Sequence, residues 1–430
     1  MARMRPAVRL LLAIVLALLT AGEAGAADEL SVLTRRALVL RQELLDRTRF
    51  RVAREQQGLG GKNEKLLLED GSGGRWLFKV IDAHRPLSLY GEVAASALSV
   101  AADGRVPPVH SITLRINGQA VLGSIQRLSP ISSTLEGVPP ERLSGSQLEQ
   151  ILELQVFDWM AGDHDTKGQN KGVLPDGQLV NFDKTQFWRF GGTDRLDWTY
   201  HPNARPGNRA EFNDQIEPYA NKVWKAWIGG KLELEPAAIS RAVGRWELLE
   251  DELIRELALG FAWVRSVLMP SPMRLTAGEL LERLLARKRS LRADCAAFLA
   301  RASQARGAPG ISLPPAEPGL RGREVLRLRG LVARLSAEAE LLGPAPASRA
   351  FREEELSVPM DDEARLRVLK FKSSDEPFDR ALADLRALLE ARTHPMARAG
   401  VGEYIERLRR LGRGEVRREE LEHVVHGRGY

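Results

Sequence analysis

The sequence predicts an α+β protein of two lobes, a strand-rich lobe followed by a helical one. Between residues 51 and 130, short apolar runs alternate with turn dipeptides that are typical of β-hairpins. From Ser146 onward the apolar residues recur at helical spacing. Polar motifs gather where the two patterns meet, so we expect a functional site between the lobes.

The composition indicates a folded protein and argues against a nucleic-acid partner. The chain has 430 residues, of which 43% are hydrophobic, enough for a sizeable core and too much for a disordered chain. Its net charge is +6; the first 26 residues hold three arginines and one glutamate, so the remainder carries +4. Such a small excess, spread over so long a chain, does not indicate nucleic-acid binding. The lone Cys295 leaves no intramolecular disulfide and no cysteine-based zinc site.

The first 26 residues have the layout of a signal peptide. Arg3, Arg5 and Arg9 accompany the apolar run 10–19, and residues 24–26 are small, as a signal peptidase requires. The run is shorter than the ~20 apolar residues that span a bilayer, so no transmembrane span is expected beyond this segment. We therefore expect export to a periplasm, a secretory lumen or the extracellular space. An N-terminal anchor that stays uncleaved is the alternative.

Each element of the first lobe follows from a local pattern. A charged helix is predicted over residues 29–55, because its leucines recur at helical spacing. Turn residues at 70–74 predict one hairpin, and Asn117-Gly118 predicts another. The strands and the intervening helix are expected at residues 64–69, 75–81, 89–102 (the helix), 111–116 and 119–126.

The second lobe begins with a helix over residues 146–160, for which Ser146 and Glu149 form a capping box. A loop, a short hairpin and a largely helical stretch to about Ala302 follow. Prolines and glycines at 307–322 predict a linker, and the leucine- and arginine-rich remainder predicts an accessory helical region. The expected domains are a signal peptide (1–26), an N-terminal helix (27–50), a two-lobed domain (51–302, with lobes 51–130 and 131–302), a linker (303–322) and a helical region (323–430).

Polar side chains are concentrated between Asp163 and Asp183. If residues 176–177 form a two-residue hairpin turn, Asn170 lies opposite Asp183 with Cβ atoms roughly 5 Å apart. A carboxylate and an amide oxygen at that separation can share one divalent cation, with phosphate oxygens and water completing the coordination. Asp165, in the loop before Asn170, would stand beside that cation and accept a proton or orient a hydroxyl. This grouping is typical of a phosphoryl-transfer site, although polar loops also use these residue types for turns.

The first lobe supplies a cation for such a site. Strand alternation places Lys79 on the face of Leu77, where a lysine needs an anionic partner. Glu92, near the start of the following helix, could hold the ammonium while it contacts nucleotide phosphates. Gly60 and Gly61 could cover a phosphate, although plain hairpin turns use the same residues. An edge-strand lysine and an exposed helix glutamate are the alternative for Lys79 and Glu92.

In this order, the motifs resemble the atypical branch of the protein-kinase-like fold. That branch contains phosphatidylinositol 3-/4-kinases, HipA-like kinases and secretory kinases of the Four-jointed type. Residues 76–79 are similar to the lysine strand of these proteins, 90–95 to the glutamate helix and 123–128 to the strand that leads into the hinge. Residues 165–170 are similar to the catalytic loop, and 180–183 to the strand that ends in the metal-binding aspartate.

This resemblance extends over about residues 51–291 and implies a two-lobed protein-kinase-like fold with a strand-rich N-lobe, a helical C-lobe and a helical C-terminal extension. It also implies ATP and Mg²⁺ as cofactors, with Mn²⁺ as a substitute ion. The implied roles are nucleotide binding for Lys79, Glu92, Gly60, Gly61 and Gln126, catalysis for Asp165, and metal binding for Asn170 and Asp183.

Two departures from the family pattern leave room for a weakened enzyme. Thr166-Lys167 follow Asp165 where these families carry Arg-His, and Lys184 follows Asp183 where a Phe-Gly or similar pair is usual. Asp163 lies in the same loop and is the alternative catalytic residue.

We expect an ATP-dependent phosphotransferase that transfers the γ-phosphate to a hydroxyl, on a protein acceptor outside the cytoplasm. A protein is favoured because the related enzymes that work there act on exported proteins or glycans. No basic amphipathic helix follows the core, which argues against a lipid headgroup. The main alternative is a weak or inactive pseudokinase that serves as a nucleotide-binding or protein-interaction module. A hydrolase with Asp163 and Asp165 as paired carboxylates is a third hypothesis.

Overall fold

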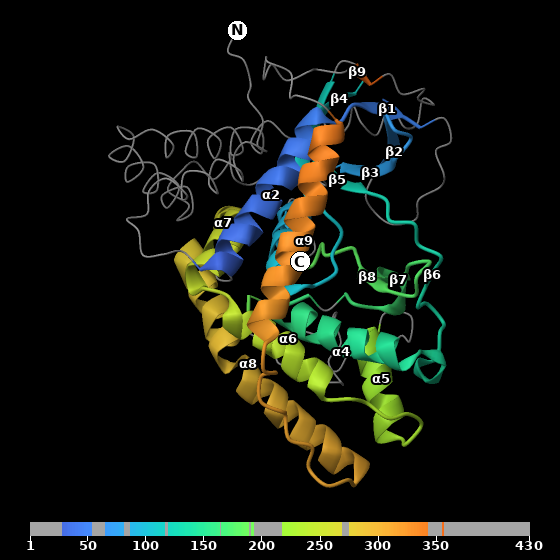
Figure 1. Ribbon diagram of the computed structural model, residues 1–430, viewed down its shortest axis with the longest axis vertical. Helices are drawn as coiled ribbons and strands as arrows, with labels where there is room; N and C mark the ends of the chain where they lie inside the picture. Colours follow the sequence, from blue (N-terminus) through green and yellow to red (C-terminus); the bar gives the residue numbers. More distant parts are fainter. Residues whose placement is uncertain are drawn as a thin grey trace, which may run out of the picture.

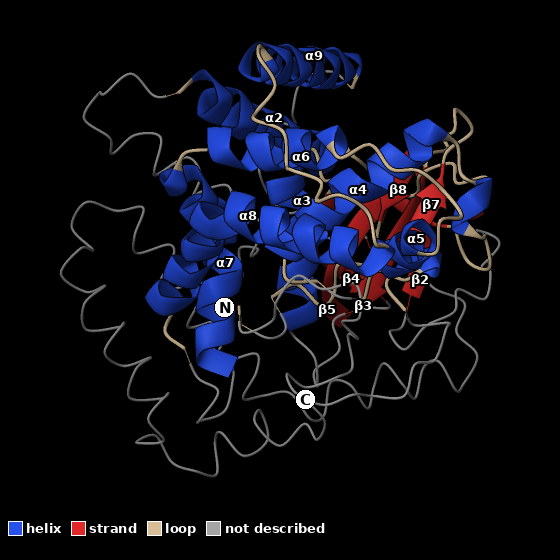
Figure 2. Ribbon diagram, turned by 90° about the horizontal axis from the view of Figure 1, so that it is seen from below, coloured by secondary structure: helices blue, strands red, loops and turns tan. Residues whose placement is uncertain are grey.

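The computed structural model describes residues 28–53, 65–80, 87–116, 119–163, 165–188, 191–192, 217–268, 275–342 and 355–356. Within this part of the chain the predicted α+β class is confirmed: a mostly antiparallel sheet forms one lobe, and helices build most of the rest (Figure 1). The strands gather on one side of the helices (Figure 2). The predicted signal peptide and the predicted phosphate-covering Gly60 and Gly61 lie outside the described residues.

The main sheet has the strand order β1-β2-β3-β5-β4-β9. Both predicted hairpins are confirmed: β2 pairs with β3 and β4 pairs with β5, each antiparallel. Their apolar faces meet in a small core around Leu68, Phe78 and Ile125, none of which is exposed. The strands are β1 (Phe50–Val52), β2 (Lys65–Asp70), β3 (Arg75–Val80), β4 (Val109–Ile116), β5 (Gln119–Arg127) and β9 (Glu355–Leu356).

The first helix is shorter than predicted. Helix α2 (Glu29–Arg47) ends eight residues before the expected limit at residue 55, because the chain becomes extended at Thr48 and enters β1. Phe50 is 8% exposed and meets Trp76 edge to face, with ring centroids 5.3 Å apart. Burial of this aromatic pair favours the strand over a continued charged helix.

Helix α3 (Leu87–Ala102) lies behind the sheet and is buried along almost its whole length. Its many small residues allow close approach to its neighbours. Ser96 and Ser99 accept the backbone N–H groups of Val109 and Val106, each at 2.9 Å, and so fix the start of β4 against the helix. Glu92, one turn into α3, is held at a fixed place relative to the sheet.

Helix α4 (Gly145–Met160) begins with a capping box that was predicted two residues too late. Ser144 accepts the Gln147 N–H at 3.2 Å, and the Gln147 side chain accepts the Ser144 N–H at 3.1 Å. The sequence repeats the Ser-x-x-Glu/Gln pattern at 144 and 146, and the earlier copy forms the cap.

A second, small sheet contains β6 (Ser133–Thr134), β7 (Lys171–Val173) and β8 (Leu179–Asn181). The predicted hairpin exists, but its register is shifted by one residue: Val173 pairs with Leu179 rather than with Val180. The turn has three residues, closed by a Leu174 N–H bond to the Gln178 carbonyl at 2.8 Å, and Gly177 at its end has φ +81°. A three-residue turn that ends in a left-handed glycine is a common hairpin alternative.

The helical lobe packs around buried aromatic rings. Trp224 meets Phe298 edge to face with centroids 4.8 Å apart, and Trp246 is 1% exposed. The helices are α5 (Tyr219–Ile228), α6 (Ala237–Leu248), α7 (Asp251–Leu268) and α8 (Ala277–Arg306), with single-turn helices at Pro140–Arg142 and Gly168–Asn170. None of the helices in the described ranges is long and apolar enough to cross a membrane.

The predicted linker packs on the core. The Ser240 hydroxyl donates to the Pro314 carbonyl at 2.7 Å, and helix α9 (Leu320–Leu341) already begins inside the expected linker. Helix α9 lies beside α2 (Figure 1). Further along, β9 pairs in parallel with the edge of β4, where the sequence predicted a helical region.

Candidate active site

The site is built around a buried lysine. Lys79 on β3 is 8% exposed, and its ammonium donates a hydrogen bond to Glu92 on α3. Ser124 on β5 lies opposite Lys79 in the sheet, and its hydroxyl donates to the other Glu92 oxygen at 2.9 Å. The predicted Lys79–Glu92 pair therefore exists, and neither member is the exposed residue of the alternative hypothesis.

Asp183 joins this pair from the other lobe. Lys79 Nζ lies 3.2 Å from Asp183 Oδ1, across 104 positions of sequence. Asp183 follows β8 by two residues and has φ +59°, a left-handed conformation that aspartate tolerates better than most residues. Its side chain is 39% exposed, against 9% for Lys79, so the carboxylate is the accessible end of the cluster.

The Lys79 ammonium and the Asp183 carboxylate stabilise each other's charged forms. Burial on its own would lower the pKa of Lys79, but the Glu92 and Asp183 carboxylates raise it above its ordinary value. Burial would raise the pKa of Asp183, yet the Lys79 ammonium, with smaller help from Lys65 and Lys167, holds it below the ordinary value. Near neutral pH the cluster consists of a charged lysine and an ionised Asp183.

The segment of residues 165–170 lies next to this cluster. Asn170 ends a single-turn helix and is 4% exposed, and its Nδ2 donates to the Asp165 carbonyl at 2.6 Å. The Asn170 carbonyl accepts the Phe182 N–H at 3.1 Å, so Asn170 lies opposite Phe182 and not opposite Asp183 as predicted. The one-residue shift comes from the three-residue turn. Asn170 is still next to Asp183 along the hairpin.

Asp165 and Asp163 have different environments. The Asp165 side chain is 16% exposed; Lys167 Nζ lies 3.3 Å from its Oδ1, and Gln186 donates to its Oδ2 at 3.3 Å. The Asp163 side chain has no exposure, and burial raises its pKa. Because a substrate hydroxyl can reach only an accessible carboxylate, the geometry favours Asp165 over Asp163 as the candidate base.

A buried ionic network lies beneath the loop. Asp158 on α4 accepts from Lys171, Lys184 and Asn181 at 2.5, 3.0 and 2.8 Å, and all four residues are at most 5% exposed. Lys184 also lies 3.1 Å from Asp163. This network anchors the hairpin that leads to Asp183.

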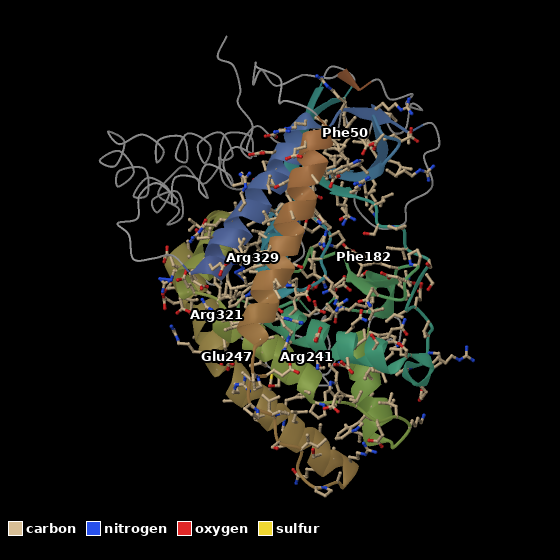
Figure 3. All side chains as sticks on the ribbon, in the orientation of Figure 1. Phe50, Phe182, Arg241, Glu247, Arg321 and Arg329 are labelled. Atoms are coloured by element: carbon tan, nitrogen blue, oxygen red, sulfur yellow. The ribbon has the colours of Figure 1, made fainter. Side chains whose placement is uncertain are left out.

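Gln126 occupies a less central place. It lies in β5 opposite Leu77, two residues from Ser124 and on the same face of the sheet as Lys79, and it is half-buried. Within the described ranges, no hydrogen bond or ion pair joins it to Lys79, Glu92 or Asp183. Figure 3 shows Phe182, the neighbour of Asp183, between Phe50 of the strand-rich lobe and Arg241 of α6.

Sequence reasoning missed several residues that hold the site together. Ser124 could have been found only by pairing β3 with β5, which are not consecutive in the chain. Lys167 and Lys184 were noted only as departures from a family pattern, and Asp158 only as part of a helix. The signal that the sequence offers is a lysine one or two residues after an acidic residue, as Lys184 follows Asp183 and Lys167 follows Asp165.

The residues fit a magnesium ion held partly by phosphate. In the described ranges no group of three or more histidine, cysteine, aspartate or glutamate side chains could hold a metal by itself. Mg²⁺ in phosphoryl-transfer sites needs only one or two protein carboxylates, with substrate phosphates and water as the other ligands. Asp183 supplies an accessible carboxylate. Because Asn170 Nδ2 is engaged, its Oδ1 is the atom that a cation could use.

Comparisons with known proteins add little to this geometry. No family model matches the chain, and no curated protein matches it. Among solved structures, a MAP kinase from Leishmania major matches with 10% sequence identity, covering 71% of this chain and 98% of that chain, with a TM-score of 0.25. A TM-score this low does not establish a shared fold, so the case for a kinase-like arrangement rests on the contacts of Lys79, Glu92 and Asp183.

Proposed function

We propose that this protein is an ATP-dependent phosphotransferase of the atypical kinase type. The observation that supports the proposal is the contact of Lys79 with both Glu92 and Asp183, which come from a helix and from a hairpin of the other lobe. A lysine paired with a helix glutamate and placed beside a metal-binding aspartate is the arrangement that orders the phosphates of a nucleotide. Burying an ammonium between two carboxylates costs desolvation free energy. A strand with only a structural role does not need such a cluster.

In this proposal each residue has a role that follows from its chemistry. Lys79 binds phosphate oxygens of ATP, and Glu92 keeps its ammonium in place. Asp183 and Asn170 would hold Mg²⁺, which neutralises charge on the transferring phosphoryl group when it is bound. Asp165 orients the acceptor hydroxyl and accepts its proton, and Lys167, 3.3 Å away, adds positive charge on the side of the loop.

The acceptor in this proposal is a protein outside the cytoplasm. The predicted signal peptide and the absence of a basic amphipathic helix after the core in the sequence favour an exported protein over a lipid headgroup.

The test is Mg²⁺-dependent turnover of ATP by the purified full-length protein. We expect Asp183→Ala to lower this activity by roughly 100-fold or more, because it removes the accessible metal ligand. Asp176→Ala in the turn of the same hairpin is the matched control, since that aspartate is exposed and bonds only the Gln178 N–H. Wild-type turnover in Asp183→Ala would contradict the metal assignment.

A second candidate function is a nucleotide-binding module without turnover. It is favoured by the sequence after Asp183, where Lys184 stands in place of the glycine-containing pair of the families that the sequence resembles. Stabilisation of the protein by ATP and Mg²⁺ in a thermal-shift assay, with no ATP consumption, would select this candidate over the enzyme.

A further inference from the structure

A fully buried ion pair joins the segments that carry Asp165, the candidate base, and Asp183, the candidate metal ligand. Lys184 and Asp163 have fully buried side chains, and Lys184 Nζ lies 3.1 Å from Asp163 Oδ2. The other Asp163 oxygen, Oδ1, accepts the backbone N–H of Asp165 at 3.1 Å. Lys184 is the covalent neighbour of Asp183. The Asp163 carboxylate therefore touches the segment of Asp165 with one oxygen and the segment of Asp183 with the other.

The segment after Asp183 also makes hydrogen bonds to the end of α4. The Trp188 N–H donates to the Ala161 carbonyl at 2.8 Å, and its indole N–H donates to the Met160 carbonyl at 3.0 Å. Trp188 has φ +50°, so the chain is sharply bent where it makes these bonds. Lys184 and Trp188 hold residues 184–188 against residues 158–163 at both ends.

The second lysine of the network has a different position. Lys171 contacts Asp158 and the Asn181 side chain, at 2.5 and 2.7 Å, whereas in the described part of the chain it is Lys184 that forms the ion pair with Asp163. The network contains two lysines and two aspartates, so its charges balance. Removal of either lysine leaves one buried negative charge in excess. Only removal of Lys184 also frees the carboxylate that bonds the Asp165 N–H.

We propose that the Asp163–Lys184 pair is a positioning device that fixes Asp165 relative to Asp183. Lys184 contacts Asp158 as well as Asp163, so it holds the segment of Asp183 against the end of α4. The catalytic meaning of this device rests on the proposed function; the mechanical coupling of the two segments does not. Asp163 is thus a positioning residue and not an alternative base.

Hydrogen exchange of the full-length protein tests the coupling without any requirement for activity. We expect Lys184→Met to speed exchange of the Asp165 amide by about tenfold or more, because its acceptor loses its buried partner. Lys171→Met is the matched control, a lysine of equal burial in the same network, and it should speed exchange mainly in the β7–β8 hairpin. An unchanged Asp165 amide in Lys184→Met, or an equal change in Lys171→Met, would overturn the proposal.

A charge-neutral double variant separates positioning from stability. Asp163→Asn with Lys184→Gln removes both charges and leaves Asp158 paired with Lys171 and Asn181, so this variant is expected to fold. We expect its kcat for ATP turnover to fall about tenfold or more while its KM for ATP stays within about twofold, because the nucleotide contacts of Lys79 are untouched. An unchanged kcat would overturn the proposal.

Failure of the proposed function has a different signature. If the wild-type protein neither binds nor turns over ATP, the enzyme proposal fails, and the exchange of the Asp165 amide alone decides the coupling. If the wild type is active and the exchange in Lys184→Met is unchanged, the function stands and the positioning role is wrong.

Discussion

Lys79 is as buried as Leu77, two residues away on the same face of the strand, at 8% exposure for each. A charge in that position is expensive unless a partner compensates it, and here Glu92 and Asp183 both do. The strand alternation around Lys79 and the position of Glu92 one turn into a helix were sufficient to predict the pair from sequence. The partner of the other Glu92 oxygen, Ser124, was not predictable because it depends on which strands pair.

Lys167 changes the meaning of one departure from the kinase pattern. The sequence has Thr166-Lys167 where the families that it resembles have Arg-His, which suggested a weakened enzyme. Lys167 places its ammonium 3.3 Å from the Asp165 carboxylate. The loop therefore keeps a positive charge beside the candidate catalytic residue. A lysine supplies this charge in place of the Arg-His pair.

His110 on β4 gives a pH-dependent prediction. Burial, and to a smaller extent Arg41, lower the pKa of its imidazole to about 3. Between pH 3 and 6.5 the unfolded chain binds a proton that the folded protein does not, so stability rises with pH through this window and this residue adds no slope above it. At pH 5 the penalty is about 2 kcal/mol.

His110→Gln should remove that penalty. We expect the loss of unfolding free energy between pH 7 and pH 5, measured by urea denaturation, to be smaller in His110→Gln than in the wild type. Parallel pH profiles for the two proteins would show that the imidazole accepts its proton in the folded state.

At the scale of elements, α3 is the part that sets the geometry of the site. It carries Glu92, and its serines fix the beginning of β4. Ser124 on β5 bonds Glu92 directly, so the sheet holds the glutamate from the side opposite to the helix backbone.

Ser124→Ala tests the contribution of this bond. We expect it to lower the free energy of unfolding by about 1.5–3 kcal/mol, because a buried carboxylate loses a hydrogen-bond donor. Ser133→Ala, an exposed serine of strand β6, should change the same quantity by less than about 0.5 kcal/mol. Chemical denaturation of both variants makes the comparison. Equal effects would mean that Glu92 does not depend on the Ser124 hydroxyl.

The elements also show where sequence patterns reach their limit. Strands β2 to β5 and helices α3 and α4 follow from periodicity and turn residues, within a few residues. The register of the β7–β8 hairpin does not follow from the sequence, because Pro175-Asp176-Gly177 permits a two- or a three-residue turn. Only the left-handed conformation of Gly177 distinguishes the two turn lengths. The docking of β9 on β4 and of α9 on α2 is set by contacts between distant segments, which no local pattern encodes.

At the scale of the whole molecule, α2 and α9 join the two lobes. Ser31 and Arg35 of α2 bond Glu250 and Glu256 at the start of α7, at 2.7 and 2.9 Å, while Leu45 at the other end of α2 packs in the core of the sheet.

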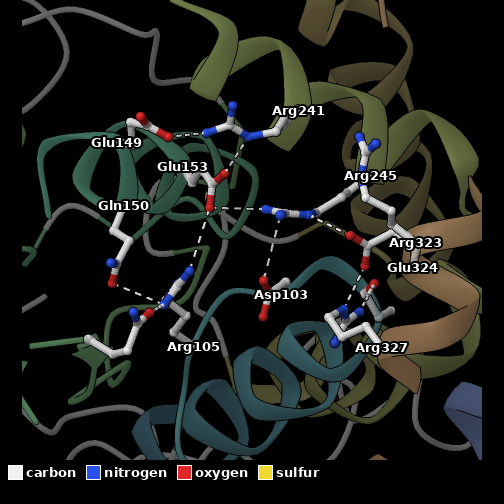
Figure 4. A network of polar contacts seen from close by, with 12 residues as sticks. Asp103, Arg105, Glu149, Gln150, Glu153, Arg241, Arg245, Arg323, Glu324 and Arg327 are labelled. Carbon is white, nitrogen blue, oxygen red and sulfur yellow. Dashed lines mark hydrogen bonds and ion pairs between the residues drawn. The ribbon is translucent and has the colours of Figure 1, made fainter. Parts of the chain in front are cut away.

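Helix α9 makes the same connection. Its Glu324 accepts a hydrogen bond from Arg245 of α6 at 2.9 Å. Arg245 also forms an ion pair with Glu153 of α4, and these residues belong to the polar network of Figure 4. At its far end, Glu338 pairs with Arg127 of β5 at 3.2 Å. A helix that is bonded to both lobes limits their relative movement.

Leu328→Ala in α9 tests whether the lobes depend on this brace. Leu328 is 0% exposed and packs with Leu30, Ala37 and Val100 of α2 and α3, so we expect the substitution to lower the unfolding free energy by about 2–5 kcal/mol. Leu326, two residues away on the same helix, is 66% exposed, and Leu326→Ala should change it by less than about 0.5 kcal/mol. Because α9 contacts both lobes, hydrogen exchange in Leu328→Ala should become faster in β3 and β5 as well as in α6. Faster exchange in one lobe alone would show that α9 stabilises that lobe without coupling it to the other.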